Sequence, residues 1–130
     1  MENPFENSLV KEIDGSYFEN NNPWMLKNKH CAIVLFYASW CGHCHNFIPD
    51  YKVFADKVPF LEVYAIESEK NKSYFNSIQN TELEVDGFPT LYFFKNGKPI
   101  KKYEGDRSPK ALIQESMKFC NQYCDCDTYN

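Results

Sequence analysis

The chain has 130 residues, a length that suits one domain with a hydrophobic core of its own. Its net charge of −4 argues against nucleic acid or an anionic membrane as its general partner. No apolar run approaches the roughly 18 residues of a membrane span, and residues 1–10 lack the pattern of a secretory signal peptide. We therefore expect a soluble protein that is cytoplasmic or viral as written; the lumen of the endoplasmic reticulum is the alternative if the chain is a mature domain.

Hydrophobic patterns and turn signals divide the chain into strands and helices. In chain order they predict a short strand at 8–13, a short helix at 23–27, a strand at 31–37, a helix from the cysteines at 41–44 to residue 55, a strand at 60–66, a helix at 67–78, strands at 90–94 and 99–103, and a last helix from 109 to 123. Residues 1–7 are polar and are expected to be loose. We expect one domain over 1–130, with its core at 8–119 and a tail at 120–130.

Three of these elements carry strong signals. Residues 31–37 (CAIVLFY) are continuously apolar, as in a central strand that is buried on both faces. Asn96-Gly97 is typical of a tight hairpin, and Ser108-Pro109 is typical of a capped helix start. Strands that alternate with helices, together with one hairpin, predict an α/β fold with a mixed central sheet and helices on both faces.

The stretch Trp40-Cys41-Gly42-His43-Cys44 concentrates the reactive side chains. Two cysteines two residues apart at the start of a helix can exist as a dithiol or close into a disulfide. The chain has 6 cysteines, fewer than a disulfide-stapled scaffold of this length would carry. Their uneven spacing indicates one reactive pair, Cys41 and Cys44, with further cysteines at 31, 120, 124 and 126.

Four sequence features resemble the thioredoxin-fold superfamily, and most closely a catalytic domain of the protein disulfide isomerase family. They are the run FYASWCGHC at 36–44, the helix proline Pro49, the run VDGFPT at 85–90 and the run YEGDR at 103–107. A lone C-x-x-C pair is a weak signal, but the order and spacing of all four match the family over most of the chain. The resemblance implies a thioredoxin fold and a thiol–disulfide oxidoreductase that forms and rearranges disulfides in proteins.

In this interpretation Cys41 is the nucleophile and Cys44 the resolving thiol of a redox-active Cys41–Cys44 disulfide. The thiolate is the attacking form of a cysteine, and a helix N-terminus stabilises it through backbone N–H groups and a partial positive charge. His43 is expected to add to this tuning, so Cys41 should be an exposed and reactive thiolate. The alternatives are a surface role for His43, and a structural zinc half-site made by the cysteines with His43 or His45.

His43 also bears on the direction of the reaction, because a stabilised thiolate makes the corresponding disulfide more oxidising. Reduction potentials of ~−180 mV for the isomerase and ~−270 mV for thioredoxin differ by about 4 kcal/mol. Disulfide formation and isomerisation are therefore favoured over reduction. The alternatives are a cytosolic thioredoxin-type reductase and a weakly active thioredoxin-fold chaperone or binding module. We expect a monomer without cofactor or metal, whose partners are thiol- or disulfide-containing proteins and a redox partner.

The resemblance also implies a substrate-binding surface beside the cysteines. A proline at the position of Pro89 is cis in the family and lies next to the cysteine pair. It leaves the backbone of Phe88 open to pair with an extended substrate, in a groove completed by Trp40 and Gly42. Simple core packing is the alternative role for Phe88.

Arg107 matches an arginine that in isomerase domains moves toward the resolving cysteine and lowers its pKa. The alternative is a surface ion pair with Asp106 or Glu104.

Two positions depart from the family pattern. The family has a buried carboxylate six residues before the first cysteine and a lysine paired with it, and this chain has Leu35 and Ala65 there. Without a buried base, Cys44 is expected to lose its proton more slowly, on the order of 10²-fold, so that a mixed disulfide lingers. Leu35→Glu should then speed its release. Glu67 is the nearest acidic substitute, but its place at a strand end makes it a poor one.

The remaining cysteines lie outside the family pattern. In this fold the last helix ends near the beginning of the central strand, far from the active site. We therefore hypothesise a structural disulfide between Cys31 and one of Cys120, Cys124 or Cys126. The alternative is that Cys31 and Cys120 are buried free thiols.

Overall fold

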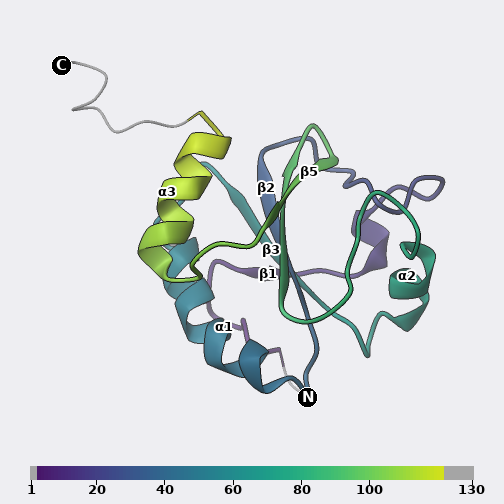
Figure 1. The fold of residues 1–130 in the computed structure, drawn as a ribbon, viewed down its shortest axis with the longest axis horizontal. Coiled ribbons are helices and arrows are strands. Elements are labelled where there is room, and N and C mark those ends of the chain that lie inside the picture. Colours follow the sequence, from purple (N-terminus) through teal and green to yellow (C-terminus); the bar gives the residue numbers. More distant parts are fainter. Residues whose placement is uncertain (1–2, 122–130) are drawn as a thin grey trace.

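The computed structural model describes residues 3–121, which form one five-stranded sheet with helices on both faces (Figure 1). The elements in chain order are β1 (Lys11–Glu12), the 3₁₀ turn η1 (Gly15–Tyr17), β2 (Ala32–Tyr37), α1 (Gly42–Ala55), β3 (Glu62–Glu67), α2 (Lys72–Ser77), β4 (Thr90–Lys95), β5 (Lys98–Tyr103) and α3 (Pro109–Phe119). The strand order is β1-β3-β2-β4-β5. The first three of these strands are parallel, and β4 and β5 run antiparallel to their neighbours. This mixed sheet confirms the predicted α/β class.

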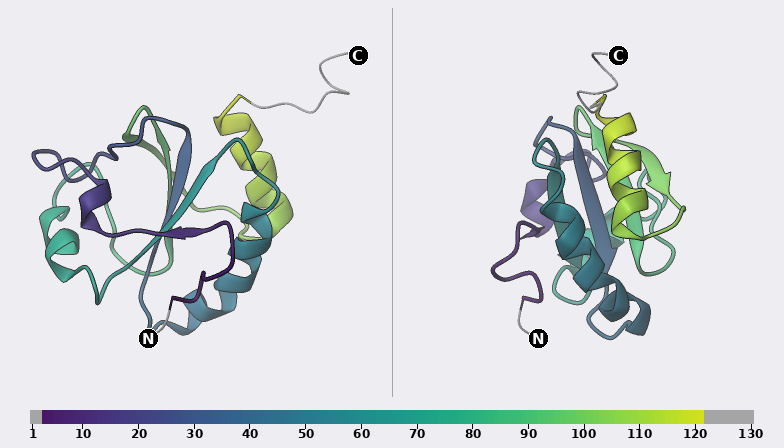
Figure 2. Two further views of the ribbon diagram at one scale, coloured as in Figure 1. Left: turned by 180° about the vertical axis from the view of Figure 1, so that it is seen from behind. Right: turned by 90° about the vertical axis from the view of Figure 1, so that its left-hand side faces the viewer.

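The strand β2 lies at the centre of the sheet, and all of its residues are buried. Its side chains alternate between two hydrophobic clusters, because successive residues of a strand point to opposite faces. The cluster on the α1 and α3 face contains Ile33, Leu35 and Tyr37, and the cluster on the α2 face contains Ala32, Val34 and Phe36. Figure 2 shows the same layers from two further sides. The chain leaves the C-terminal end of β2 and soon enters α1, so the cysteine pair lies just beyond the end of the central strand.

The N-terminal residues differ from the prediction that 1–7 are loose. Phe5 is only 1% exposed and packs edge-on against Tyr37 and Tyr51, with ring centroids 5.6 and 6.1 Å apart. The large area that Phe5 removes from water orders the turn around it, so the core begins before residue 8. The strand predicted at 8–13 is reduced to the two residues of β1.

Two predicted helices are also revised. Residues 23–27 form no helix, because the N–H of Leu26 donates to the Gly97 carbonyl at 2.8 Å and so is bonded to the hairpin instead of to a preceding turn. The helix predicted at 67–78 begins only at Lys72, because Glu67 is still the last residue of β3.

The hairpin and the last helix form as predicted. Asn96 and Gly97 both have positive φ angles, of 55° and 82°. A Cβ on Gly97 would lie 2.6 Å from the Leu26 carbonyl oxygen, so both the turn and this close approach require glycine. Ser108 caps α3 by accepting a hydrogen bond from the Ala111 N–H at 3.2 Å. The helix ends at Phe119; the predicted end at residue 123 lies outside the described residues.

Within residues 3–121, no helix has the length and apolar character that crossing a membrane requires.

Candidate active site

The loop between β2 and α1 places the cysteine pair at the first turn of α1. Cys41 is the N-cap residue, and its Sγ accepts a hydrogen bond from the backbone N–H of Cys44 at 3.3 Å. A side chain in this position lies against N–H groups that have no partner within the helix, where a partial positive charge favours an anion. The geometry therefore places the Cys41 sulfur at the backbone donors of the first turn of α1.

The two thiols differ in burial and in their surroundings. Cys41 is 7% exposed and Cys44 is 0% exposed. Cys41 is the more accessible of the two, but it is far less exposed than the sequence predicted. Burial raises the pKa of Cys44 to about 12, and the Cys41 thiol adds to this, whereas the backbone of Ala38 and the charge of Arg107 lower it. Cys44 therefore keeps its proton at neutral pH unless a base removes it.

An open stretch of main chain lies beside Cys41. The peptide bond between Phe88 and Pro89 is cis, and the Cys41 Sγ lies 3.7 Å from the Phe88 carbonyl oxygen. Among the described residues, the backbone N–H of Phe88 has no hydrogen-bond partner. Phe88 can therefore pair with the backbone of an extended chain that approaches Cys41.

A groove of about 470 Å³ borders this stretch. Trp40 forms one wall; it is 67% exposed and packs edge-on against Phe88, with 5.9 Å between ring centroids. Phe88 also packs against Phe75 at 6.0 Å and is half-buried, so it lines the groove and packs against the core. The groove is lined by Trp40, Ser68, Glu69, Phe75, Ile78, Gln79, Asn80, Leu83, Glu84, Val85, Asp86 and Phe88. The lining thus combines apolar side chains with the carboxylates of Glu69, Glu84 and Asp86.

Pro89 and Gly42 do not line this groove. Pro89 lies in a neighbouring hollow with Phe88 and Arg107. Gly42 is exposed, and no atom lies within 4 Å of the position that a Cβ would take there.

Arg107 lies near Cys44 and shares a hollow with Phe88 and Pro89. Its Nη2 donates to the Pro89 carbonyl at 3.5 Å, and its charge lowers the pKa of Cys44. The alternative ion pair with Asp106 or Glu104 is absent from the described part of the chain. The Asp106 carboxylate instead accepts hydrogen bonds from the N–H and the hydroxyl of Ser108.

The two histidines of the motif region occupy different places. His43 is exposed in a shallow hollow that also contains Arg107. His45 donates from Nε2 to the Ser39 carbonyl at 2.6 Å and so helps to hold the loop before Cys41. Within residues 3–121, no group of three or more His, Cys, Asp or Glu side chains is arranged to hold a metal ion.

The carboxylate of Glu67 also holds the active-site loop, through hydrogen bonds from backbone N–H groups. It is 2% exposed, and its carboxylate accepts hydrogen bonds from the N–H groups of Ser39 at 3.0 Å and Lys70 at 2.9 Å. Burial alone would raise the pKa of Glu67, but the backbone donors outweigh it and hold the pKa below its usual value. Glu67 is therefore an anchor for the loop and a poor proton acceptor.

Glu67→Gln should destabilise the protein by about 1–3 kcal/mol at pH 7, because an amide replaces charge-assisted bonds to two backbone donors. A depressed carboxyl pKa contributes stability that is present above the unfolded value, near 4.5, and is lost as the pH falls through the folded value. The difference between the two proteins should therefore shrink below pH 4.5. Urea unfolding between pH 3 and 7 measures it. Glu82→Gln removes an exposed carboxylate and should show no such trend; a constant difference at all pH values would contradict the assignment.

Buried apolar side chains occupy the two positions where the family has a carboxylate and a lysine. Leu35 and Ala65 are register partners on β2 and β3, and both are 0% exposed. The next residue in the same row is Glu12 of β1, which pairs with Ala65. The sequence did not point to Glu12, because only the parallel pairing of β1 with β3 brings it to this row.

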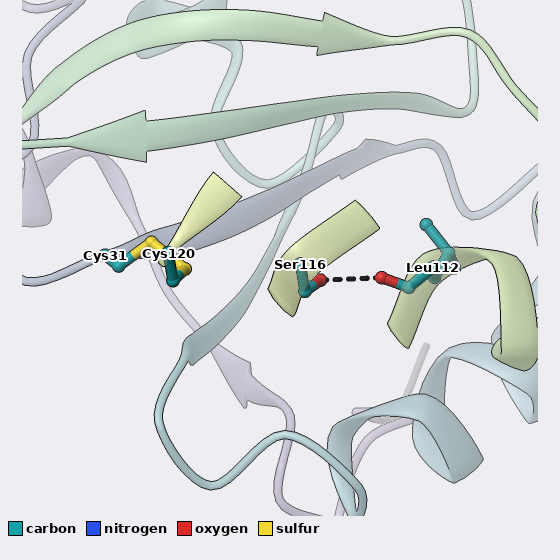
Figure 3. The surroundings of a disulfide bond; sticks show 4 residues. All are labelled: Cys31, Leu112, Ser116 and Cys120. Atoms are coloured by element: carbon teal, nitrogen blue, oxygen red, sulfur yellow. Dashed lines mark hydrogen bonds between the residues drawn. A yellow bond between two sulfur atoms is a disulfide. The ribbon is translucent and has the colours of Figure 1, made fainter. Parts of the chain in front are cut away.

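A disulfide joins Cys31 to Cys120 (Figure 3). Cys31 lies before β2 and Cys41 lies after it, so the disulfide and the cysteine pair lie beyond opposite ends of this strand. Cys31 directly precedes β2 and Cys120 directly follows α3, with 6.0 Å between their Cα atoms. This agrees with the hypothesis of a structural disulfide and replaces the alternative of two free thiols. Cys124 and Cys126, the other candidate partners, lie outside the described residues. Cys41 and Cys44 are free thiols.

Comparison with known proteins identifies relatives of this chain. The sequence pattern of the family described as Thioredoxin matches residues 10–118. Probable protein disulfide-isomerase A4 of Caenorhabditis elegans is 34% identical over 99 residues, which are 74% of this chain and 15% of that protein. Protein disulfide-isomerase of Medicago sativa is 35% identical over 113 residues, which are 85% of this chain and 21% of that protein. Thioredoxin Y, chloroplastic, of Oryza sativa subsp. japonica is 32% identical over 99 residues, which are 75% of this chain and 56% of that protein.

Solved structures show the same fold. The crystal structure of the J-Trx1 fragment of ERdj5 has a TM-score of 0.71 at 23% identity and covers 88% of this chain and 53% of that chain. The solution structure of the first thioredoxin domain of mouse protein disulfide-isomerase A4 has a TM-score of 0.68 at 23% identity and covers 92% of this chain and 79% of that chain. The chain spans less than two thirds of the length of the curated relatives named above. It has the thioredoxin fold and belongs to the thioredoxin family, with homologues among the protein disulfide isomerases.

Proposed function

We propose that the protein is a thiol–disulfide oxidoreductase of the protein disulfide isomerase type, which forms and rearranges disulfides in protein substrates. The observation that carries this proposal is the position of the Cys41 sulfur. It caps the N-terminus of α1 and lies 3.7 Å from the carbonyl oxygen of Phe88, whose N–H has no partner among residues 3–121. A substrate strand that pairs with Phe88 brings its own sulfur to Cys41.

The proposed reaction is an exchange of sulfur partners. The Cys41 thiolate attacks one sulfur of a substrate disulfide, and the other substrate sulfur leaves as a thiolate. Cys44 then attacks Cys41, which releases the substrate and leaves the Cys41–Cys44 disulfide. Run in reverse, the same steps oxidise a substrate dithiol, and escape from the mixed disulfide before completion rearranges substrate disulfides.

The groove supports protein substrates in particular. Trp40 is exposed and packs edge-on against Phe88, which gives a side chain of the substrate an apolar surface beside the reactive sulfur. Homologues that are named protein disulfide-isomerases support the same substrate class. The charge of Arg107 lowers the pKa of Cys44, and this effect supports a role for Arg107 in the resolving step.

Two assays test the proposal. We expect the protein to accelerate the refolding of scrambled ribonuclease more strongly than it reduces insulin, because His43 favours an oxidising pair. A reduction potential near ~−180 mV would agree with this, and one near ~−270 mV would favour a thioredoxin-type reductase. Insulin reduction without ribonuclease refolding would contradict the isomerase proposal.

A second candidate is a thioredoxin-fold binding module with weak turnover. The observation that favours it is the buried Cys44 thiol, with a pKa of about 12, next to a face where Leu35 and Ala65 supply no base. Failure in both assays with retained binding of unfolded peptides would support this candidate.

A further inference from the structure

The groove that Trp40 and Phe88 share carries charge of one sign. Three exposed carboxylates line it, those of Glu69, Glu84 and Asp86, and no lysine or arginine among residues 3–121 lines it with them. Exposed carboxylates are ionised at neutral pH. Because Phe88 offers its backbone to a substrate strand and also lines this groove, the negative charge acts directly on what binds there.

Positive side chains of the protein neutralise the groove only in part. The Nζ of Lys72 lies 3.6 Å from a carboxylate oxygen of Glu69, but both side chains are exposed, so solvent screens this pair. Glu84 and Asp86 form no ion pair within residues 3–121. Two of the three carboxylates are therefore available to a cation that arrives with the substrate.

Hydrogen bonds hold the charged residues in place. The hydroxyl of Tyr92 accepts a hydrogen bond from the Glu84 N–H and donates one to the Glu84 carbonyl, both at 3.1 Å. The carboxylate of Glu69 accepts a hydrogen bond from Nε1 of Trp40 at 3.4 Å. Glu84 thus lies on an anchored stretch of backbone, and Glu69 positions the exposed aromatic wall of the groove.

The groove also contains a polar group that lacks a partner. Ser68 lines it and is only 8% exposed. The side-chain oxygen of Ser68 is buried and has no hydrogen-bond partner among residues 3–121. Buried polar atoms are normally paired, and a hydroxyl oxygen can accept a hydrogen bond. A donor that enters the groove would supply the partner that the chain itself does not provide.

The apolar walls suit the stem of a long basic side chain. Trp40, Phe75 and Phe88 form these walls in a groove of about 470 Å³. Lysine and arginine bury their methylene groups on apolar surface while the charged end stays among polar groups. Their N–H groups are donors only, which matches the carboxylate and hydroxyl oxygens of the groove. A cation beside a tryptophan ring is also attracted by the face of the ring.

The neighbouring hollow that contains Phe88 has a different charge. Lys102 and Arg107 line it together with Glu104 and the stretch that includes Pro89. An acidic side chain of a substrate would meet two positive groups there, but only negative groups in the groove. The two surfaces that share Phe88 therefore differ in the sign of the charge that they attract.

We propose that the groove selects protein substrates in which basic residues lie beside the reactive cysteine. The inference rests on the thiol–disulfide exchange proposed above and names its substrate class. The substrate main chain pairs with Phe88, and the stem of a lysine or arginine lies along Trp40. Its charged end lies among the carboxylates. Glu84 and Asp86 attract the charge, and Glu69 acts mainly by positioning Trp40.

Two peptides that differ only in charge test this preference on the full chain. Each peptide has one cysteine joined to thiopyridine by a disulfide, with either lysine or glutamate two positions before and two positions after the cysteine. Side chains two positions apart share a face of an extended chain, and charge on both sides makes the test independent of the direction in which the peptide runs.

Release of thiopyridine measures the attack by Cys41. The Cys41 thiolate forms a bond to the peptide sulfur, and the bond to thiopyridine breaks; thiopyridine leaves as a thiolate that takes up a proton from solvent. Cys44 then displaces the peptide thiolate, so the cysteine pair is oxidised by two electrons and the peptide disulfide is reduced by two. Dividing each rate constant by that of the same peptide with dithiothreitol, an uncharged dithiol, removes the peptide's own reactivity.

We expect the lysine peptide to react about tenfold faster than the glutamate peptide at low salt. The ratio should fall below about twofold in about 1 M salt, where charges are screened within about 3 Å. Glu84→Gln combined with Asp86→Asn should lower the low-salt ratio to about threefold or less. A general loss of activity in a variant slows both peptides and leaves the ratio unchanged, so the ratio reports charge selection alone.

Glu82→Gln is the matched control for overall charge, because the protein has a net charge of −4. Glu82 is an exposed carboxylate of the same connection between α2 and β4, but it does not line the groove, so its removal should keep the wild-type ratio. A ratio lowered as much by Glu82→Gln as by the groove variant would overturn the inference.

The remaining outcomes separate the inference from the proposed function. Equal rates for the two peptides on the wild type would overturn the inference and leave the proposed exchange standing. Release of thiopyridine from neither peptide would overturn the proposed function itself. Should the double variant fail to fold, Glu84→Gln alone should lower the ratio about twofold; an unchanged ratio there would contradict the role of the groove.

Discussion

Replacing Cys44 with alanine is expected to trap substrate proteins on Cys41 as stable mixed disulfides. The Cys44 backbone N–H donates to the Cys41 Sγ at 3.3 Å, so the resolving thiol belongs to the first turn of the helix that Cys41 caps. Attack within one helical turn is intramolecular and gains the large effective concentration of such reactions. Without Cys44, release depends on external thiols, and we expect it to fall by at least about 10³-fold. Alanine suits the site because the Cys44 side chain is fully buried.

Non-reducing electrophoresis and peptide mapping measure this result. Reduced Cys44→Ala should accumulate an adduct with a disulfide-containing peptide, and mapping should place the adduct on Cys41. Cys41→Ala is the matched control and should form no adduct at this helix, because the attacking sulfur is absent. Unimpaired turnover in Cys44→Ala would contradict the assignment of the resolving thiol.

Removing the disulfide between Cys31 and Cys120 is expected to cause the largest loss of stability. The two residues are 89 positions apart, and closing a loop of this length restricts the unfolded chain. In the chain-entropy treatment the bond stabilises the protein by about 4–5 kcal/mol. That is a large part of the ~5–15 kcal/mol by which domains are stable. We therefore expect Cys31→Ala with Cys120→Ala to unfold at a much lower denaturant concentration.

The same variant should keep its exchange chemistry under conditions where it is folded. The disulfide lies where β2 begins, and Cys41 lies beyond the opposite end of that strand. Urea unfolding with and without a reductant provides the measurement: the reductant should destabilise the wild type and leave the double variant unchanged. Cys41→Ala with Cys44→Ala is the control and should keep the sensitivity to reductant. A free Cys31 thiol in the non-reduced protein would contradict the prediction.

Local sequence patterns were sufficient to predict several elements, including the strand and the helix on either side of the cysteine pair. The apolar run at 31–37 predicted β2 almost to the residue, and Ser108-Pro109 and Asn96-Gly97 predicted the start of α3 and the hairpin. These signals depend on hydrogen bonds and backbone angles within a few residues, so a single segment contains them. The start of α1 at the cysteines is of the same kind.

The sequence was misleading where contacts between distant segments outweigh local preference. Residues 23–27 have a helix-start signal, but the Leu26 N–H is bonded to the Gly97 carbonyl. Phe5 lies among polar residues that resemble a loose terminus, and its burial against Tyr37 and Tyr51 orders them. In both cases hydrogen bonds or buried area from elsewhere in the chain replace what the local pattern offers.

The chemistry of the site divides in the same way. The pair Cys41 and Cys44 is visible in the sequence because the spacing of the cysteines is set by one helical turn. Trp40 and the Phe88-Pro89 stretch were expected beside it only because the resemblance to the family implies it. The surroundings of Cys44 are not visible there, since they depend on strand register: pairing of β1 with β3 and of β3 with β2 brings Glu12 into the row of Ala65 and Leu35. A shift of one residue in either pairing would turn Glu12 to the other face, away from Tyr37. The reactive pair is thus encoded locally, whereas the hydrogen bond between Tyr37 and Glu12 exists only through the tertiary structure.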